Sequence, residues 1–144
     1  MTTTNPANLI EARQQELIET FEMFSDWMEK YEHLIDLGKG LEALDEADRV
    51  EENLIKGCQS RVWLALKSNE GGRLHFTADS DAIITKGLVA LTLNLLSNAP
   101  AELIATANLH SLQTIGLHEH LSPTRSNGLT SMVQQIKLAA LKQC

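Results

Sequence analysis

The sequence predicts an α+β domain in which a small antiparallel sheet of about three strands packs against helices on one face. Three observations support this: apolar residues recur at helical spacing at both ends, two central segments alternate with period two, and two glycines separate those segments. A chain of 144 residues with 43% apolar and 22% charged residues has the size and composition of one globular domain. We therefore expect residues 1–144 to form a single domain.

Two helices are expected before residue 40. Asn8 and Glu11 have the spacing of an N-terminal capping box, and apolar residues follow at helical intervals. Asp26 and Glu29 repeat the capping pattern, and a glycine-containing stretch ends the second helix near Gly38.

Residues 42–52 contain six acidic residues and one arginine, with little apolar periodicity. Such a charged stretch is typical of a solvated connection. An acidic docking surface for a basic partner is the alternative.

A β-hairpin is predicted in the middle of the chain. The pattern has period two in two segments: Val62, Leu64 and Leu66 alternate with Arg61, Trp63 and Lys67, and Leu74 and Phe76 alternate with Arg73, His75 and Thr77. Asn69–Gly72 lies between the two segments. Glycines supply the positive φ angles of a tight hairpin turn, so the two strands should be antiparallel. A short strand over Asn53–Lys56 would add a third.

A long buried helix is expected from Ala82 to Leu96. The residues before it, 79–81, offer side-chain oxygens that can cap its first turn. Gly87 lies inside this helix, where glycine costs about 0.5–1 kcal/mol relative to alanine. A close backbone contact at Gly87 would offset that cost.

The rest of the chain is predicted to be helical. Short helical pieces follow Pro100 and continue to about Leu117, and Ser122–Pro123 has the pattern of an N-cap followed by proline at the first helical position. Gly128 in the last helix again indicates that another part of the backbone packs closely.

Several function classes are excluded at this stage. The net charge of −7 argues against nucleic acid, and no apolar run is long enough to cross a membrane. The first residues lack the layout of a secretory signal, so we expect a cytoplasmic protein. Two cysteines cannot form a disulfide framework or a four-cysteine zinc site. His118 and His120 could ligate a metal, but a surface or capping role is favoured, and no metal is expected.

Cys58 is the candidate reactive residue. Gly57 and Cys58 interrupt the chain between the presumed short strand and the hairpin, which would present the thiol on a loop. Lys56 and Arg61 would lower the pKa of the thiol, whereas the acidic stretch before them would raise it. The interpretation that Cys58 is simply a small buried hydrophobic residue is equally well supported.

Arg125 is unusual because it would be the third residue of the last helix. A cation at that end of the helix dipole is disfavoured by about 0.3–1 kcal/mol. Either Arg125 pairs with a carboxylate, which is the default reading, or it is displayed to a partner or an anionic substrate.

Three segments together resemble the SufE family of cysteine-desulfurase partners, which includes the CsdE proteins. They are Gly57-Cys58-Gln59-Ser60-Arg61-Val62-Trp63, Asp79-Ser80-Asp81-Ala82 running on to Lys86-Gly87-Leu88, and Leu121-Ser122-Pro123-Thr124-Arg125-Ser126-Asn127-Gly128-Leu129. The resemblance covers nearly the whole chain and implies a SufE/IscU-like fold.

The resemblance implies a sulfur-transfer accessory protein rather than an enzyme. Cys58 would accept persulfide sulfur from a SufS- or CsdA-type cysteine desulfurase, stimulate it, and pass the sulfur to a SufBCD-type scaffold for iron–sulfur cluster assembly. The pyridoxal phosphate (PLP) belongs to the desulfurase, so no cofactor is expected here. The partner-binding residues would be Gln59, Asp81, His120 and Arg125.

Other readings remain open. A CsdE-type protein would deliver sulfur to another acceptor, and a desulfurase-binding adaptor would use Cys58 only for packing. An IscU-type scaffold would need several converging thiolates, and a thiol peroxidase would need Cys144 as its resolving cysteine. The sequence also allows a homodimer.

Overall fold

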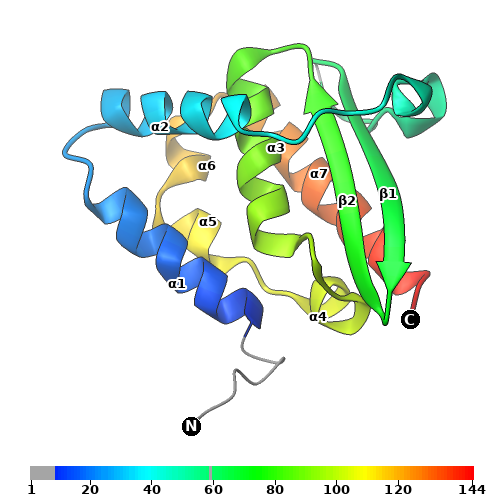
Figure 1. Cartoon of the computed structure of the whole chain (residues 1–144). Helices are drawn as coiled ribbons and strands as arrows, with labels where there is room; N and C mark the ends of the chain where they lie inside the picture. Colours follow the sequence, from blue (N-terminus) through cyan, green and yellow to red (C-terminus); the bar gives the residue numbers. More distant parts are fainter. Residues whose placement is uncertain (1–8, 59) are drawn as a thin grey trace, which may run out of the picture.

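The computed structural model describes residues 9–58 and 60–144. Figure 1 shows the β1–β2 hairpin on one side, α3 in the middle, and α1 and α2 on the other side. In chain order the elements are α1 (Leu9–Glu22), α2 (Trp27–Lys39), the short 3-10 turns η2 (Glu46–Asp48) and η3 (Glu51–Asn53), β1 (Val62–Glu70), β2 (Arg73–Ser80), α3 (Ile83–Leu96), β3 (Ala99–Pro100), α4 (Ala101–Thr106), α5 (His110–Thr114), α6 (Leu117–His120) and α7 (Pro123–Leu141).

The predicted α+β class is confirmed. The sheet has three strands in the order β1–β2–β3, and both strand pairs are antiparallel. The turn between β1 and β2 contains Gly71 and Gly72, with φ angles of +61° and +87°. These are the positive angles that a two-residue hairpin turn requires, so the glycines fix the register of the hairpin.

The third strand is not the one that the sequence predicted. Residues 53–56 make only an isolated bridge between Leu54 and Trp63, because the chain just before it is wound into η3. The third strand is the two-residue β3, which pairs with the beginning of β2. Pro100 has no N–H to donate, which favours so short a pairing.

The first helices begin and end close to the predicted positions. The carboxylate of Asp26 accepts a hydrogen bond of 2.9 Å from the backbone N–H of Glu29 and caps α2. The capping box predicted at Asn8 falls outside the described residues.

None of the described helices combines the length and the hydropathy needed to cross a membrane.

The predicted close contact at Gly87 is confirmed. A Cβ atom at this position would lie 2.2 Å from the backbone oxygen of Leu34 in α2. Gly38 faces it, since a Cβ there would lie 3.0 Å from the nitrogen of Gly87. The two glycines therefore allow the backbones of α2 and α3 to touch, and most of α3 is buried as a result.

The acidic stretch is not simply a solvated connection. It packs across the outer face of the hairpin, where Leu44 and Leu54 cover Trp63 and Ala65. Its charges make specific contacts: Lys67 pairs with Asp45 at 2.9 Å and with Asp48 at 2.5 Å.

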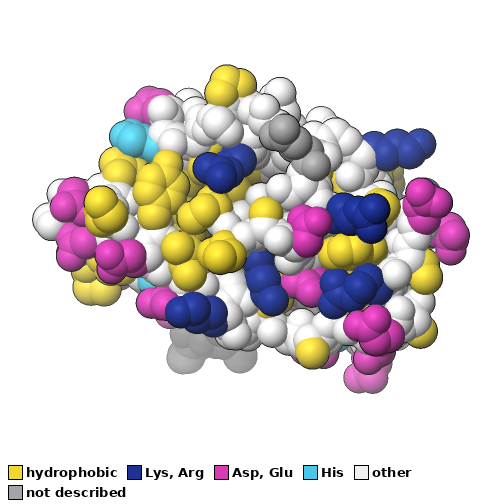
Figure 2. Space-filling model, turned by 90° about the horizontal axis from the view of Figure 1, so that it is seen from above, with side chains coloured by type: hydrophobic (Ala, Val, Ile, Leu, Met, Phe, Trp, Pro, Cys, Tyr) yellow, Lys and Arg dark blue, Asp and Glu magenta, His cyan; other side chains and the backbone are white. Residues whose placement is uncertain are grey.

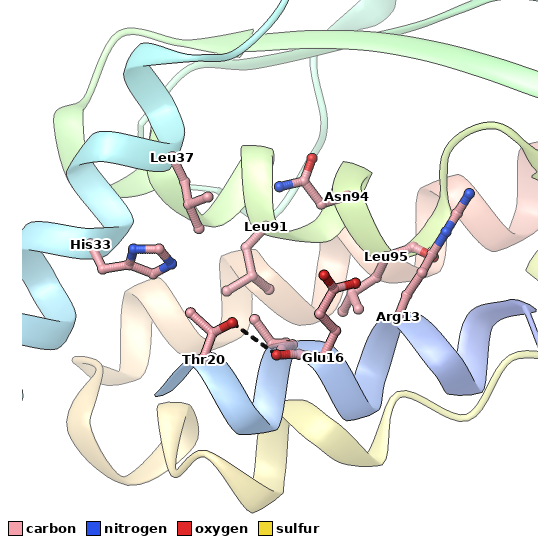
Figure 3. Close-up of a pocket in the computed structure, with 9 residues that line it drawn as sticks. Arg13, Glu16, Thr20, His33, Leu37, Leu91, Asn94 and Leu95 are labelled. Carbon is pink, nitrogen blue, oxygen red and sulfur yellow. Dashed lines mark hydrogen bonds between the residues drawn. The ribbon is translucent and has the colours of Figure 1, made fainter. Parts of the chain in front are cut away.

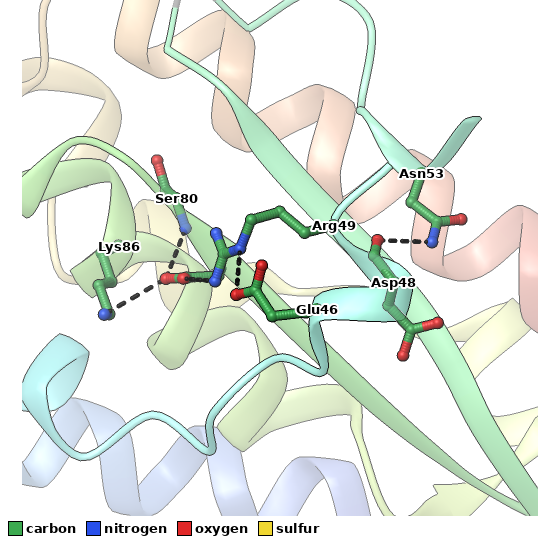
Figure 4. Close-up of polar contacts among 7 residues, drawn as sticks. Glu46, Asp48, Arg49, Asn53, Ser80 and Lys86 are labelled. Atoms are coloured by element: carbon green, nitrogen blue, oxygen red, sulfur yellow. Dashed lines mark hydrogen bonds and ion pairs between the residues drawn. The ribbon is translucent and has the colours of Figure 1, made fainter. Parts of the chain in front are cut away.

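Arg49 anchors the same stretch. Its guanidinium pairs with Asp79 of β2 at 2.8 Å, and Lys86 reaches the other oxygen of Asp79 (Figure 4). The same guanidinium lies over the ring of Trp63. The segment of residues 42–54, called the strap below, is thus packed on the sheet rather than solvated, because its few apolar residues cover the Trp63 face.

His75 makes the stability of the protein depend on pH. Its ring nitrogens lie 2.6 Å from Oδ1 of Asn98 and 2.9 Å from a carboxylate oxygen of Glu42. The hydrogen bonds to Asn98 and Glu42 raise the pKa of His75. Because the pKa is higher in the folded state, protonated His75 stabilises the fold. This stabilisation is complete below the pKa of the unfolded state and is lost as the pH rises through the pKa of the folded state.

In the native protein, the free energy of unfolding should fall as the pH rises above about 6.5, the ordinary pKa of histidine. We expect this fall to be smaller in His75→Gln, because glutamine does not titrate. Urea unfolding at a series of pH values measures this. An unchanged slope in His75→Gln would contradict the assignment.

Candidate functional site

The Cys58 loop is held against the last helix. Gly128 of α7 is buried, and a Cβ atom there would lie 3.4 Å from Sγ of Cys58. The thiol itself lies 3.7 Å from the carbonyl oxygen of Gly128. The close packing expected at Gly128 is confirmed, and the segment that packs there is the cysteine loop.

Gly57 and Ser131 form the second contact between the loop and α7. Gly57 has a φ of +92°, and a Cβ atom on it would lie 2.6 Å from Oγ of Ser131. Glycine is therefore required both by its backbone angle and by its space. Sequence reasoning missed Ser131; its spacing of three residues after Gly128, on the same helical face, was the available signal.

Cys58 opens onto a pocket of about 320 Å³ between the loop, the first turn of α3 and the first turns of α7. Hydroxyl groups and one guanidinium dominate its polar lining. The lining residues are Cys58, Ser60, Thr85, Ser122, Thr124, Arg125, Gly128 and Met132. Thr85, like Ser131, was not singled out from the sequence.

Burial raises the pKa of the Cys58 thiol. The sequence left the direction of this shift open, and the burial of the side chain decides it. Since the thiolate is the nucleophile, Cys58 is a protected thiol in this conformation. A change of environment that exposes the sulfur would lower the pKa and increase its reactivity.

Asp81 closes the other end of the loop. Its carboxylate accepts a 3.1 Å hydrogen bond from the N–H of Arg61, and its own N–H donates to the carbonyl of Arg61 at 3.3 Å. The predicted capping of α3 by the preceding side chains is wrong for Asp81, because the N-cap position belongs to Ala82, which has no side-chain cap. Asp81 instead fixes where the cysteine loop enters β1.

Arg125 has no ion pair among the described residues, so the default reading of a structural pair is wrong. Its backbone N–H donates to Oγ of Ser122, the N-cap of α7, while its side chain is exposed at the pocket. A cation at the positive end of a helix with no carboxylate partner is available to an anion or to an acidic partner.

His120 and His118 are not among the residues that line the pocket. The ring of His120 stacks on Trp27 at 3.9 Å between centroids, and its carbonyl accepts a hydrogen bond from Tyr31. His118 contacts Ser126 through a 2.6 Å hydrogen bond. Gln59 falls outside the described residues. Within the described ranges, no cluster of three or more His, Cys, Asp or Glu side chains could hold a metal ion.

Cations border the cysteine loop although the whole chain carries a net charge of −7. Lys56, Arg61 and Arg125 are all exposed. In Figure 2, Lys and Arg side chains lie in the middle of the face beside a hydrophobic group, with some Asp and Glu side chains between them, and the other Asp and Glu side chains lie toward its two ends. The charge distribution suits an acidic partner surface.

A larger groove of about 470 Å³ lies between α1, α2 and α3 (Figure 3). Its most prominent cation, Arg13, already donates to the carbonyls of Leu95, Ser97 and Asn98 at 2.7–3.1 Å. These bonds cap the end of α3, so Arg13 has a structural role. This groove contains neither cysteine.

Comparison with known proteins gives a consistent result. The SufE family model, described as an Fe-S metabolism associated domain, matches residues 15–140. An uncharacterised SufE-like protein of Rhizobium etli is 41% identical over 133 residues, covering 90% of each chain. The solution structure of a hypothetical protein from Thermus thermophilus matches with a TM-score of 0.75 at 17% identity, covering 91% of this chain and 95% of that one.

Proposed function

The chain belongs to the SufE family, and from this premise we propose that Cys58 accepts sulfur from the persulfide of a cysteine desulfurase and carries it to an iron–sulfur assembly scaffold of the SufBCD type. The observation that carries the proposal is the position of Cys58, a cysteine on a glycine-hinged loop at the edge of a polar pocket. The chain is an accessory protein in this scheme, and it stimulates the desulfurase by removing its sulfur.

The proposed transfer is a thiol–persulfide exchange. The thiolate of Cys58 attacks the outer sulfur of the partner's persulfide, a new sulfur–sulfur bond forms on Cys58, and the partner's cysteine leaves as a thiolate. No oxidant or reductant is consumed. The pyridoxal phosphate needed to remove sulfur from free cysteine stays on the desulfurase, and this chain needs no cofactor of its own.

Docking must also change the surroundings of Cys58. The thiol is half-buried against Gly128, and its raised pKa keeps it protonated and weakly nucleophilic. We propose that the docked desulfurase displaces the loop from α7. The sulfur of Cys58 is then exposed next to the partner's persulfide. The contact with α7 would then protect the thiol from oxidation between transfers.

We assign the docking surface to the edge of the pocket. Arg125 is exposed and free of ion pairs within the described part of the chain, and Asp81 holds the loop entry. His120, fixed by Trp27 and Tyr31, and Gln59 complete the proposed set.

Reversing the charge of Arg125 tests this surface. We expect Arg125→Glu to weaken association with the cognate desulfurase by roughly tenfold and to reduce stimulation at subsaturating concentrations, because an anion would face an acidic partner surface. The measurement is a binding titration together with the rate of alanine formation.

Lys142→Glu is the matched control, since it makes the same charge change on an exposed residue at the opposite end of α7. It should bind like the native chain. Equal binding by the Arg125→Glu variant would remove Arg125 from the docking surface, and a desulfurase that does not respond to the native chain would refute the proposed function.

A further inference from the structure

We propose that the pocket beside Cys58 binds a small thiol bearing a carboxylate, and that such a thiol can collect sulfur directly from Cys58. The inference rests on the proposed function in one respect, namely that Cys58 carries sulfur. It adds a second acceptor class, a small molecule, to the protein acceptor proposed above.

The pocket is much larger than a persulfide requires. Its volume is about 320 Å³. A water molecule occupies about 30 Å³ of liquid, so the pocket has space for roughly ten waters, whereas a persulfide adds only one sulfur atom to Cys58. Most of the space therefore remains available to a second molecule in contact with the sulfur.

The start of α7 offers the pocket a donor for an anion. Pro123 has no N–H, and the N–H of Arg125 is bound by Ser122 at 3.3 Å. The N–H of Thr124 has no backbone acceptor among the described residues. It lies at the positive end of a 19-residue helix, beside the hydroxyls of Ser122 and Thr124.

Two further groups in the pocket lack partners. Thr85 is only 8% exposed, and its hydroxyl, which lines the pocket, makes no hydrogen bond to another described residue. The guanidinium of Arg125 lines the same pocket and forms no ion pair within the described ranges. The hydroxyl of Thr85 and the guanidinium of Arg125 can therefore both hydrogen-bond a polar ligand in the pocket.

Together these groups define the ligand chemistry. A carboxylate fits between the guanidinium of Arg125 and the N–H of Thr124, since both are donors that favour a negative charge. Because Cys58 Sγ borders the same pocket, a thiol on a short chain from that carboxylate would reach the sulfur.

The transfer step is balanced. The thiolate of the small molecule attacks the outer sulfur of the Cys58 persulfide and forms a new sulfur–sulfur bond. The bond between the two sulfurs on Cys58 breaks, and Cys58 leaves as a thiolate that takes up the proton released by the incoming thiol. No electrons are gained or lost overall.

Two thiols of similar size and opposite charge, 3-mercaptopropionate and cysteamine, provide the test. In a Cys144→Ser chain, Cys58 is loaded with inorganic polysulfide, so no desulfurase is involved, and sulfur release is followed by intact mass. The ammonium of cysteamine lowers the pKa of its thiol and gives it the larger thiolate fraction, so cysteamine reacts faster when no site exists.

We expect the reverse order: faster release by 3-mercaptopropionate, with a rate that saturates with concentration. Arg125→Gln should reduce the 3-mercaptopropionate rate by about tenfold, as expected for loss of a charge-assisted contact, and leave the cysteamine rate unchanged. Lys142→Gln is the matched control and should behave like the parent. Faster release by cysteamine in every variant, with rates linear in concentration, would overturn the inference.

A binding arm separates this inference from the proposed function. Addition of 3-mercaptopropionate to the unloaded Cys58→Ser, Cys144→Ser chain should shift the amide resonances of Thr85 and Thr124 in a saturable way. If these resonances do not move, the pocket does not bind the anion, whatever Cys58 does. If they move but no sulfur can be placed on Cys58 by polysulfide or by the desulfurase, the proposed function fails instead.

Discussion

Cys58→Ser is expected to abolish sulfur transfer while leaving the fold and desulfurase binding intact. Serine has the same shape as cysteine beside Gly128, although its hydroxyl is smaller and more polar than the thiol, and it provides no sulfur nucleophile. Among the described residues the thiol makes one long hydrogen bond of 3.7 Å, and the side chain is only partly buried, so the unfolding free energy should change by no more than about 1 kcal/mol. Stimulation of the desulfurase should fall to the level measured without the protein.

The measurements are alanine formation by the cognate desulfurase, a binding titration and urea unfolding of the same preparations. Cys144→Ser is the control, because Cys144 is exposed at the end of the chain, and it should behave as the native protein does. Stimulation by the Cys58→Ser variant equal to that of the native chain would favour a desulfurase-binding adaptor over a sulfur carrier.

Gly87→Ala is expected to destabilise the protein severely. The new Cβ would overlap the carbonyl oxygen of Leu34 at 2.2 Å, and that atom belongs to the backbone of α2, so no side-chain rotation relieves the contact. Alanine is the better helix former by about 0.5–1 kcal/mol, but separating two packed helices costs more. We expect a net loss of about 3 kcal/mol in urea unfolding.

Two other glycines of the α2 region calibrate this result. At Gly38 a Cβ would lie 3.0 Å from the nitrogen of Gly87, so Gly38→Ala should have an intermediate effect. At Gly40 the nearest atom is 3.7 Å away and φ is −88°, so Gly40→Ala should change the stability by less than about 1 kcal/mol. Equal effects at Gly87 and Gly40 would show that the helix contact is not what requires glycine.

The local elements could be predicted because each carries its own signal. Asp26 and Glu29 mark the start of α2, Gly71 and Gly72 mark the hairpin turn, and Ser122–Pro123 marks the start of α7. The glycine in α3 also predicted its close contact, since an unfavourable residue inside a helix needs compensation. None of these inferences depended on a distant part of the chain.

The strap could not be predicted because its signal is non-local. Leu44 and Leu54 are separated by ten positions, most of them polar or charged, and only the folded hairpin brings them to the same side of Trp63. The charges of the strap likewise find partners on the hairpin, with Arg49 reaching Asp79 and Lys67 reaching Asp45 and Asp48. Charge runs are usually solvated, and the tertiary contacts override that expectation here.

The candidate site could be predicted in part. The cysteine and the arginine were identified from a loop position and from an unfavourable place in a helix, and the structure brings both to one pocket. Thr85 and Ser131 were missed because they follow ordinary helical patterns, and their importance depends on how α3 and α7 face the loop. Asp81 was assigned to helix capping because the sequence does not show that Arg61 lies opposite it.

Intact-protein mass spectrometry tests the central claim most directly. The native chain, Cys58→Ser and Cys144→Ser are each incubated with cysteine and an active cognate desulfurase, and their masses are compared before and after reduction. The account predicts a gain of one sulfur atom, reversed by reductant, in the native chain and in Cys144→Ser but not in Cys58→Ser. No gain in any variant, or a gain that persists in Cys58→Ser, would contradict it.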